Sequence, residues 1–483
     1  MPESIKRAMG RVRRVHFVGI GGAGMSGIAE VMHNLGYTVT GSDKNETDVT
    51  RRLSAAGIRI ARGHAAEHVS DADVVVVSSA ISPANPEVCA AQERRIPVIR
   101  RAEMLAELMR FREGIAIAGT HGKTTTTSLI ASVLAEGRLD PTYVIGGRLN
   151  STGSHARLGE GRYLVAEADE SDASFLHLQP VIAVITNIDA DHLDFYQGDF
   201  GNLKNSFVEF VNRMPFYGLV VLCADDPVVM EILPRISKSF VTFGLDRDAD
   251  YRARITGRSA SCIDFSVARY GEAGWLEVNL NLMGSHNVLN ALAAIIVATE
   301  LGVAREDIKR ALSAFQGIGR RCSILGEARL EKGTVMVIDD YAHHPSEIKA
   351  TLAAVKGGWP DRRVIVVFQP HRYTRTRDLF DDFCRVLADT DMLFVMEVYP
   401  AGESPISGID SRALCRGVRL RGKVQPVYIE QRQQLDTALE EECQDGDILL
   451  LMGAGDIGNV GPALLAEYRQ HAGEGAGRDG TGG

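Results

Sequence analysis

A turn rich in glycine, lysine and threonine is the part of this sequence best suited to bind a polyphosphate. The apolar residues 115–118 read as a strand, residues 119–122 form a glycine turn, and residues 128–134 follow with helical spacing. In a strand–loop–helix of this kind, backbone N–H groups surround a phosphate at the helix N-terminus, where the helix dipole favours an anion. The pattern therefore predicts a phosphate-binding loop.

Two side chains of this loop indicate a nucleoside triphosphate. Lys123 would reach the β- and γ-phosphates, and the Thr124 hydroxyl would bind Mg²⁺. Two residues, Thr120 and His121, separate the glycines here, whereas the general P-loop has four. A Gly-Lys-Thr string can also simply cap a helix, but the flanking strand and helix and four consecutive threonines favour the nucleotide.

Length and composition are those of a multidomain globular protein. The chain of 483 residues is too long to fold around a single hydrophobic core. At about 150 residues per domain, its length predicts three domains. No apolar run approaches the roughly 18 residues that cross a bilayer, and residues 1–14 lack the apolar core of a secretory signal. Seven cysteines without metal-ligand spacing predict reduced thiols in the cytoplasm. The net charge of −9 argues against nucleic acid as a partner.

The N-terminal region carries a dinucleotide-type fingerprint. Residues 12–19 read as a strand, Gly19-Ile20-Gly21-Gly22-Ala23-Gly24 follows, and residues 28–35 have helical periodicity. Asp43 comes after the next strand, about 20 residues beyond the glycines, where an acid takes ribose hydroxyls. The motif indicates a diphosphate on a helix N-terminus, and NAD and a UDP-sugar fit it equally well. The candidate residues are Gly21, Gly22, Ala23, Gly24, Met25, Ser26, Asp43 and, at the end of a further strand, Ser79.

Acidic clusters follow two predicted strands of the central region. Residues 163–166 end on Glu167, and residues 181–187 lead to Asp191 and His192. Carboxylates delivered to the carboxyl ends of parallel strands suit a Mg²⁺–nucleotide site, although a lone acidic loop is usually only solvated. Residues 241–282 read as short alternating strands, and a helix opens near His286 and Asn287.

The C-terminal region reads as a third α/β sheet. Its predicted strands are residues 335–338, 363–368, 392–398 and 448–452, with polar loops at their ends. A zwitterionic amino acid needs a cationic fork for its carboxylate, and Arg372 and Arg375 on one loop would supply it. Tyr341, His343 and His371 follow neighbouring strands and would orient the amine.

From residue 12 to about residue 468 the chain resembles the Mur ligase family. The matching positions are the shortened ATP loop Gly119, Thr120, His121, Gly122, Lys123, Thr124 and Thr125, then Glu167, Asp191-His192, His286-Asn287 with Asn290, and Arg320. The family's short loop explains the departure from general P-loop spacing. Folylpolyglutamate synthetases share the central fold, but the N-terminal glycine fingerprint favours a UDP-muramoyl substrate. No lysine is equated with the carbamylated lysine of some family members.

The resemblance implies ATP-dependent amide synthesis in the making of peptidoglycan precursors. L-alanine would be joined to the carboxylate of UDP-N-acetylmuramate through an acyl phosphate, giving ADP and phosphate. The glycine string at residues 19–27 looks more like the alanine-adding branch than the relatives that attach a whole peptide in cell-wall recycling, which remain the alternative. A dehydrogenase using NAD would leave the P-loop unexplained, and a non-ligating ATPase would leave the third domain unexplained.

The resemblance also implies roles for individual residues. The expected catalytic set is Lys123, Glu167, His192, Arg320 and Asp340. Thr124 and Glu167 would hold one Mg²⁺ (or Mn²⁺), and His192 would ligate a second. Asn287 and Asn290 would read adenine, and Arg320 and Asp340 would close on the nucleotide.

The expected architecture is α/β with three domains. Residues 1–110 form a Rossmann-like UDP-sugar domain, 111–318 a P-loop domain with a mainly parallel sheet, and 319–472 a Rossmann-like amino-acid domain, with a flexible tail at 473–483. The expected partners are the three small-molecule substrates, without nucleic acid or membrane insertion, and the expected state is a monomer or weak homodimer in the cytoplasm.

Overall fold

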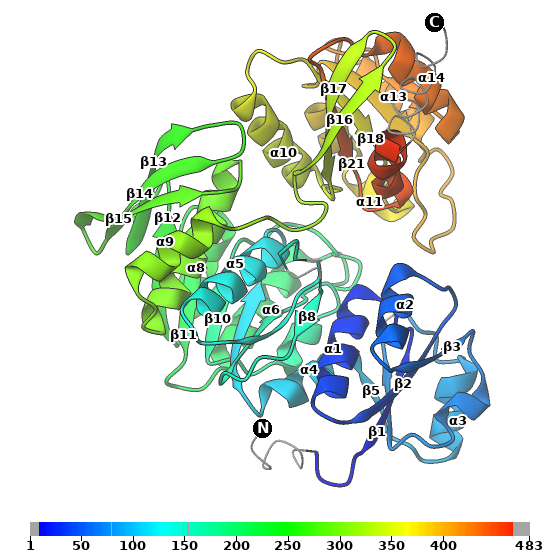
Figure 1. The fold of residues 1–483 in the computed structure, drawn as a ribbon, viewed down its shortest axis with the longest axis vertical. Helices are drawn as coiled ribbons and strands as arrows, with labels where there is room; N and C mark the ends of the chain where they lie inside the picture. Colours follow the sequence, from blue (N-terminus) through cyan, green and yellow to red (C-terminus); the bar gives the residue numbers. More distant parts are fainter. Residues whose placement is uncertain (1–8, 79, 148, 152–153, 467–483) are drawn as a thin grey trace, which may run out of the picture. The chain divides into compact units, whose positions relative to one another are not determined.

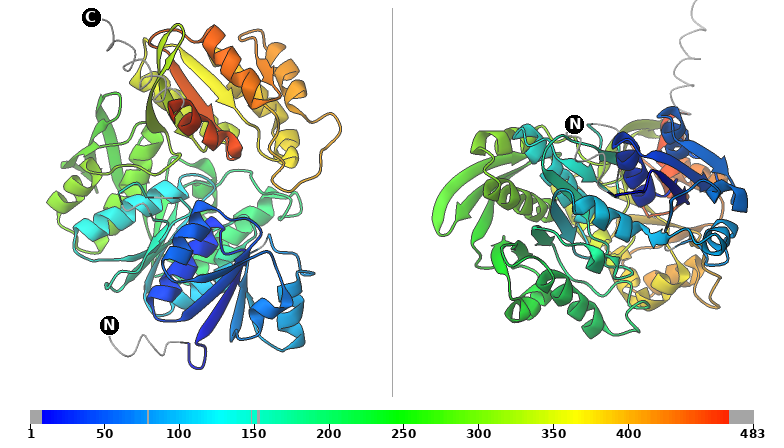
Figure 2. Two further views of the ribbon diagram at one scale, coloured as in Figure 1. Left: turned by 45° about the vertical axis from the view of Figure 1, so that its right-hand side comes forward. Right: turned by 90° about the horizontal axis from the view of Figure 1, so that it is seen from below.

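The computed structural model describes residues 9–78, 80–147, 149–151 and 154–466 (Figure 1). The chain divides into two compact units. The first runs to Gly257 and includes Asp264–Asn281 and His286–Gln316, and the second holds Arg258–Ile263, Leu282–Ser285 and the chain from Gly317 on. Three sheets follow one another along the sequence, and each keeps to its own range of colours in the views of Figure 2.

The first sheet has five parallel strands in the order β3-β2-β1-β4-β5. They are β1 (Arg14–Val18), β2 (Thr38–Asp43), β3 (Arg59–Arg62), β4 (Val74–Val77) and β5 (Val98–Arg100). β4 is a run of four valines, whose β-branched side chains suit a buried strand. The strand order reverses between β1 and β4, and ligands bind at the carboxyl ends of strands at such a point.

Helices cover both faces of this sheet. One face packs against α1 (Ala23–Asn34) and α4 (Arg101–Met109), and the other against η2 (Ala66–Val69) and α3 (Pro86–Glu93). α2 (Asp48–Ala55) connects β2 to β3 and begins with a capping box between Thr47 and Thr50. The core under α1 and α4 continues into the central sheet through residues such as Val144 and Ala156. This shared core is why the first two sheets belong to one unit.

The central sheet has ten strands in the order β15-β14-β13-β12-β11-β10-β6-β9-β7-β8. They are β6 (Glu113–Ala118), β7 (Thr142–Val144), β8 (Ala156–Arg157), β9 (Tyr163–Glu167), β10 (Ile182–Ile185), β11 (Leu219–Cys223), β12 (Ser239–Gly244), β13 (Tyr251–Arg258), β14 (Ile263–Arg269) and β15 (Glu272–Leu280). β6 pairs in parallel with β9 on one side and β10 on the other. The loop after β6 therefore lies between the two loops that carry the acidic clusters.

The helices of this region are α5 (Lys123–Glu136), η3 (Ser174–His177), α6 (Phe200–Asn212), α7 (Pro227–Ile232), η4 (Leu233–Arg235), α8 (Ser285–Glu300) and α9 (Arg305–Ser313). Most side chains of α5 and α8 are buried around the whole helix circumference, as expected of helices inside a core. Because α5 is enclosed in this way, the phosphate-loop residues at its start have a rigid support.

The third sheet lies in the second unit and has the strand order β16-β17-β21-β18-β19-β20. Its elements are β16 (Ser323–Leu330), β17 (Gly333–Asp340), α10 (Pro345–Gly358), β18 (Val364–Phe368), α11 (Tyr373–Asp378), α12 (Phe380–Leu387), β19 (Met392–Met396), α13 (Ser411–Arg419), β20 (Val427–Ile429), α14 (Arg432–Glu442), β21 (Ile448–Met452) and η5 (Asp456–Asn459). Only the β16–β17 pair among the described pairings of this sheet is antiparallel. Apolar side chains alternate between its faces, with α10, α12 and α13 on one and α14 and η5 on the other.

The predicted three-domain α/β architecture is confirmed, and its exact boundaries stay predictions. The predicted loop carrying Arg372 and Arg375 is partly wrong, because α11 begins at Tyr373 and places Arg375 in a helix. The tail 473–483 lies outside the described residues. No described helix is both long and apolar enough to cross a membrane, and none of the seven cysteines, all of which are described, forms a disulfide.

Candidate active site

The loop between β6 and α5 has the backbone of a phosphate cradle. The φ angles of Gly119 and Gly122 are both positive, at +130° and +81°, and residues other than glycine rarely adopt such values. A Cβ at Gly119 would collide with the Thr186 hydroxyl, and one at Gly122 would lie 2.7 Å from Asn290 Oδ1. Both positions therefore require glycine, and the backbone is free to approach an anion closely.

Lys123, the first residue of α5, is held by a buried carboxylate. Its Nζ donates to both oxygens of Glu170, at 2.8 and 2.7 Å, and to Gly119 O at 2.6 Å. Burial lowers the pKa of the ammonium, but the carboxylates of Glu170, Asp169 and Glu167 outweigh burial and raise it. Lys123 is therefore a charged donor inside the phosphate loop. Sequence reasoning singled out Glu167 in this cluster and gave Glu170 no role.

Thr124 and Glu167 lie on the two elements that frame the loop. Thr124 is buried in the first turn of α5, and Glu167 ends β9, where its Oε1 accepts from Gly146 N at 2.6 Å. A threonine hydroxyl and a carboxylate are oxygen donors of the kind that Mg²⁺ prefers. Together with the phosphate loop that Gly119 and Gly122 shape, the oxygens of Thr124 and Glu167 fit a nucleotide with its Mg²⁺ ion.

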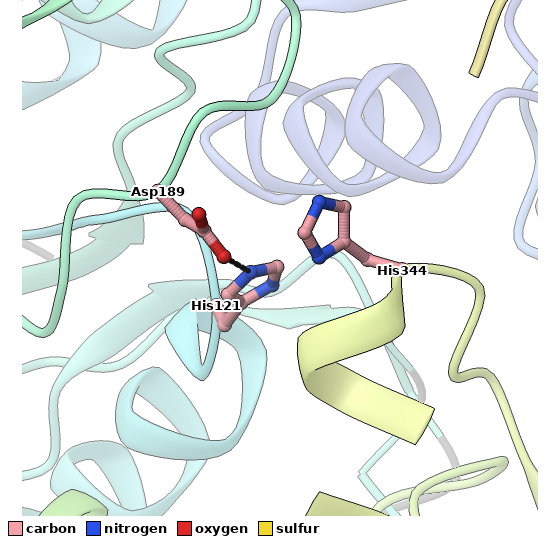
Figure 3. A group of neighbouring side chains, drawn as sticks. All are labelled: His121, Asp189 and His344. Atoms are coloured by element: carbon pink, nitrogen blue, oxygen red, sulfur yellow. Dashed lines mark hydrogen bonds and ion pairs between the residues drawn. The ribbon is translucent and has the colours of Figure 1, made fainter. Parts of the chain in front are cut away.

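The loop after β10 holds the phosphate loop from its other side. His121 N donates to Asn187 Oδ1 at 2.8 Å, and Asp189 N donates to Thr120 Oγ1 at 2.8 Å. His121 Nε2 lies 3.2 Å from Asp189 Oδ2, and Figure 3 shows the two side chains facing one another. His192 is further along this loop and pairs with Asp191 at 3.4 Å. Glu167 therefore contacts Gly146, and His192 contacts Asp191. Their assignment to two separate metal ions stays a prediction.

Asn287 and Asn290 are brought to the phosphate loop by α8. Asn290 Oδ1 accepts from Thr126 Oγ1 at 3.1 Å, and Asn290 Nδ2 donates to Asn287 Oδ1 at 3.0 Å. Both side chains are buried. The Asn290 amide thus ties α8 to α5 directly behind Gly122, and its predicted contact with adenine stays a prediction.

In the first sheet, Asp43 and the glycine loop are joined. Asp43 Oδ2 accepts from Gly21 N at 2.8 Å, and a Cβ on Gly21 would lie 2.8 Å from the same oxygen. Asp43 also lines a pocket of ≈ 480 Å³ with residues of α2 and β3, including Thr50 and Ile60. The structure therefore places the predicted ribose acid beside both the glycine turn and a cavity.

The remaining predicted residues of this loop differ in accessibility. Gly22 is the N-cap of α1, and Ala23 and Gly24 begin the helix. The side chains of Met25 and Ser26 are buried, so contact with a ligand there is left to the backbone. Ser79 lies outside the described residues.

A buried carboxylate supports the end of β2. Glu87, fully buried on α3, accepts from Ser42 Oγ at 2.6 Å and from His68 Nδ1 at 2.6 Å. His64 Nδ1 lies 3.1 Å and His16 Nε2 3.7 Å from the same carboxylate. Because Ser42 precedes Asp43, this cluster fixes the strand end that presents the predicted ribose acid. Sequence reasoning missed it, since its members are spread over β1, β2, α3 and the η2 region.

In the second unit, Arg320 and Asp340 are held by neighbouring backbone. Arg320 has φ +61°, its Nε lies 3.2 Å from Asp339 Oδ2, and its Nη2 donates to Gly453 O at 2.6 Å. Asp340 accepts from Cys322 N at 2.6 Å and from Ala342 N at 2.7 Å. Burial raises the pKa of Asp340 to about 6. Arg320 and Asp340, which are predicted to close on the nucleotide, are therefore held in place by contacts within the second unit.

The five residues predicted to bind an amino acid gather at the ends of β17 and β18. The Tyr341 and His343 rings are 5.3 Å apart, and the His343 and His371 rings 5.7 Å apart. Arg375 Nη1 lies 3.4 Å from His371 Nδ1. Arg375 is buried, whereas Arg372 is exposed.

Burial lowers the pKa of His371 to about 3, and His343, Arg375 and Arg372 add to this effect. His371 is consequently neutral at pH 7. The cluster combines two cationic side chains with a neutral imidazole, which suits the carboxylate and the amine of an amino acid.

The fold and these loops define an ATP-dependent ligase. Residues 14–113 match the Mur ligase family catalytic domain, 117–298 the Mur ligase middle domain, and 320–455 the Mur ligase glutamate ligase domain. The structure is similar to UDP-N-acetylmuramate–alanine ligase MurC from Thermotoga maritima, with 31% identity, a TM-score of 0.81, and coverage of 95% of this chain and 99% of that one. The chain belongs to the Mur ligase family of ATP-dependent, amide-forming ligases.

Two peptide-adding relatives are also similar. A murein peptide ligase from Psychrobacter arcticus has 25% identity and a TM-score of 0.69, covering 94% of this chain and 98% of that one. UDP-N-acetylmuramate:L-alanyl-γ-D-glutamyl-meso-diaminopimelate ligase from Neisseria meningitides has 30% identity and a TM-score of 0.59, covering 64% of this chain and 100% of that one. Family membership favours a ligase over the dehydrogenase and the non-ligating ATPase.

Proposed function

We propose that this chain uses ATP to join L-alanine to the carboxylate of UDP-N-acetylmuramate, a step in peptidoglycan precursor synthesis. The observation that carries the proposal is the likeness to the alanine-adding ligase, which extends over 95% of this chain with a TM-score of 0.81. The peptide-adding relatives match with TM-scores of 0.69 and 0.59.

The first step is phosphoryl transfer from ATP to the muramoyl carboxylate. A carboxylate oxygen attacks the γ-phosphorus, the bond to the β-phosphate oxygen breaks, and an acyl phosphate and ADP result. Such a step needs positioning and charge neutralisation more than covalent help from the protein. The Lys123 ammonium releases the Glu170 carboxylate, binds the γ-phosphate in its place and neutralises part of its charge. Thr124 and Glu167 would hold one Mg²⁺ and His192 a second, and the metal supplies further neutralisation of phosphate charge.

The second step is aminolysis of the acyl phosphate. The amine of L-alanine attacks the acyl carbon, and the tetrahedral intermediate expels phosphate to leave the amide. Arg372 and Arg375 bind the alanine carboxylate. The neutral imidazole of His371 accepts a hydrogen bond from the amine, where a charged one would repel an ammonium group.

Phosphate release tests the choice of amino-acid substrate. The protein is supplied with ATP and UDP-N-acetylmuramate, together with L-alanine, glycine, L-serine or the tripeptide L-alanyl-γ-D-glutamyl-meso-diaminopimelate in turn. Release with L-alanine and not with the tripeptide supports the proposal. Release with the tripeptide alone assigns the chain to the peptide-adding ligases.

Hydroxylamine tests the order of the steps. With ATP and UDP-N-acetylmuramate but no amino acid, it should trap the activated muramoyl group as a hydroxamate. A hydroxamate that forms only when L-alanine is present argues against an acyl phosphate formed first.

A further inference from the structure

Arg101 lies between the glycine loop of the first sheet and the acidic loop beside Lys123. It begins α4, directly after β5. Its Nη2 donates to Asp169 Oδ2 at 3.0 Å. A Cβ on Gly24 would lie 2.6 Å from Nη1 of the same guanidinium. Since Gly24 belongs to the first turn of α1, the guanidinium lies against the helix end that the fingerprint assigns to a diphosphate.

Most of the hydrogen-bonding capacity of the Arg101 guanidinium is unused by the residues that the structure describes. A guanidinium has five N–H donors. Within the described residues, the bond from Nη2 to Asp169 is the only hydrogen bond of the Arg101 side chain. The side chain is 26% exposed, so solvent or a ligand reaches it. An ion pair this exposed adds little stability by itself, and the donors that do not bond to Asp169 are accessible to a ligand that displaces solvent.

Asp169 aims the guanidinium and ties it to the ATP site. It lies two residues beyond Glu167 and directly before Glu170, the partner of Lys123. Its other oxygen accepts from Ser171 N at 3.1 Å, which fixes the carboxylate. The loop that holds Lys123 therefore also fixes Arg101.

Gly24 has a role that the fingerprint alone does not indicate. It has no positive φ, so backbone conformation does not demand glycine there. The missing side chain is instead the space that the Arg101 guanidinium occupies. Any side chain at position 24 would therefore displace the Arg101 guanidinium from the first turn of α1.

We propose that Arg101 is a further substrate-binding residue, whose free N–H donors bind the diphosphate of the UDP-sugar while Asp169 positions it. This rests on the proposed function, because it takes a UDP-sugar as the substrate of the first sheet. The helix end and the guanidinium together then neutralise a group that carries two negative charges.

Binding of UDP to Arg101→Ala tests the proposal, with Arg100→Ala as the control. Arg100 is the preceding residue and is exposed, and its hydrogen bond to Glu103 is donated by its backbone N–H, which the substitution keeps. Calorimetric titration with UDP should show affinity weakened about 10- to 150-fold in Arg101→Ala, the range for lost hydrogen bonds to a charged group. Arg100→Ala should bind UDP as the wild type does, and ATP affinity should be unchanged in both variants.

Two further variants separate ligand binding from a structural role. Asp169→Asn breaks the same ion pair but keeps the cation, so its UDP affinity should stay much closer to the wild type than that of Arg101→Ala. Arg101→Lys keeps the charge but not the planar fork and should fall between the two. It also keeps the test open if Arg101→Ala fails to fold.

Equal loss of UDP binding in Arg101→Ala and Asp169→Asn, with lowered melting temperatures in both, would overturn the proposal. That result would mean that the ion pair between Arg101 and Asp169 only stabilises the fold. Wild-type UDP affinity in Arg101→Ala or Arg101→Lys would also overturn it. If the wild-type protein itself binds no UDP and releases no phosphate with UDP-N-acetylmuramate and L-alanine, the proposed function fails before the role of Arg101 is tested.

Discussion

Replacing Glu87 by glutamine tests whether one buried carboxylate stabilises the part of the chain that forms the first sheet. Burial raises the pKa of Glu87, but its contacts with His16, Ser42 and His68 outweigh burial and lower the pKa to about 2. Glutamine keeps the shape and one acceptor oxygen and removes the negative charge. The substitution therefore isolates the contribution of the ionised form.

The magnitude follows from the two pKa values. An ordinary glutamate has a pKa of 4.5, so the folded protein lowers it from 4.5 to about 2. At about 1.4 kcal/mol per unit, the ionised group contributes about 3 kcal/mol at pH 7. The compact unit that holds this sheet has about 300 residues, so at about 2.1 cal/mol/K of unfolding entropy per residue this loss lowers the melting temperature by roughly 5 °C.

The pH dependence has a definite sign. A carboxyl whose folded pKa is lowered contributes stability that is fully present above its unfolded pKa of 4.5 and is lost as the pH falls towards about 2. The difference in melting temperature between wild type and Glu87→Gln should therefore be constant from pH 6 to 7 and shrink below about pH 4.5.

Differential scanning calorimetry of both proteins across this pH range provides the assay, with Glu93→Gln as the control. Glu93 is on the same helix, α3, and is exposed, so its substitution should leave the melting temperature unchanged. Equal melting temperatures of wild type and Glu87→Gln at pH 7 would refute the reasoning. A difference that persists undiminished at pH 3.5 would refute the assignment to the carboxylate charge.

The remaining predictions concern the three proposed substrate sites. Lys123→Ala should abolish ATP-dependent phosphate release while leaving UDP-sugar affinity intact, and ligation near the wild-type rate would refute the phosphate-loop assignment. Asp43→Ala should weaken UDP-sugar binding in calorimetric titrations and spare ATP, whereas loss of NAD binding would restore the dehydrogenase interpretation. Arg372→Ala and Arg375→Ala should each raise the KM for L-alanine, or lower kcat/KM, by about 10- to 150-fold, with the exposed Arg377→Ala as control. If they lose UDP-sugar binding instead, the cluster serves the sugar nucleotide.

Local sequence patterns were enough to predict the class of fold and the phosphate loop. The run Val74–Val77 and the glycines at 119 and 122 specify a strand and a turn through their own backbone preferences. The α/β alternation predicted three sheets, and the substrate predicted for each sheet stays a prediction. These features depend on residues that are neighbours in the sequence, which is why a single sequence reveals them.

Contacts between distant residues were decided by the tertiary structure. Lys123 pairs with Glu170 because strand pairing places β9 beside β6, and periodicity contains no information on strand order. The guanidinium of Arg101 reaches Gly24 because α1 and α4 pack on the same face of the first sheet. Arg375 lies in a helix and is buried beside His371, whereas its basic surroundings in the sequence resemble a solvated loop. In each case the partner is chosen by sheet order and helix packing, which arise only when the apolar faces of separate elements are buried together.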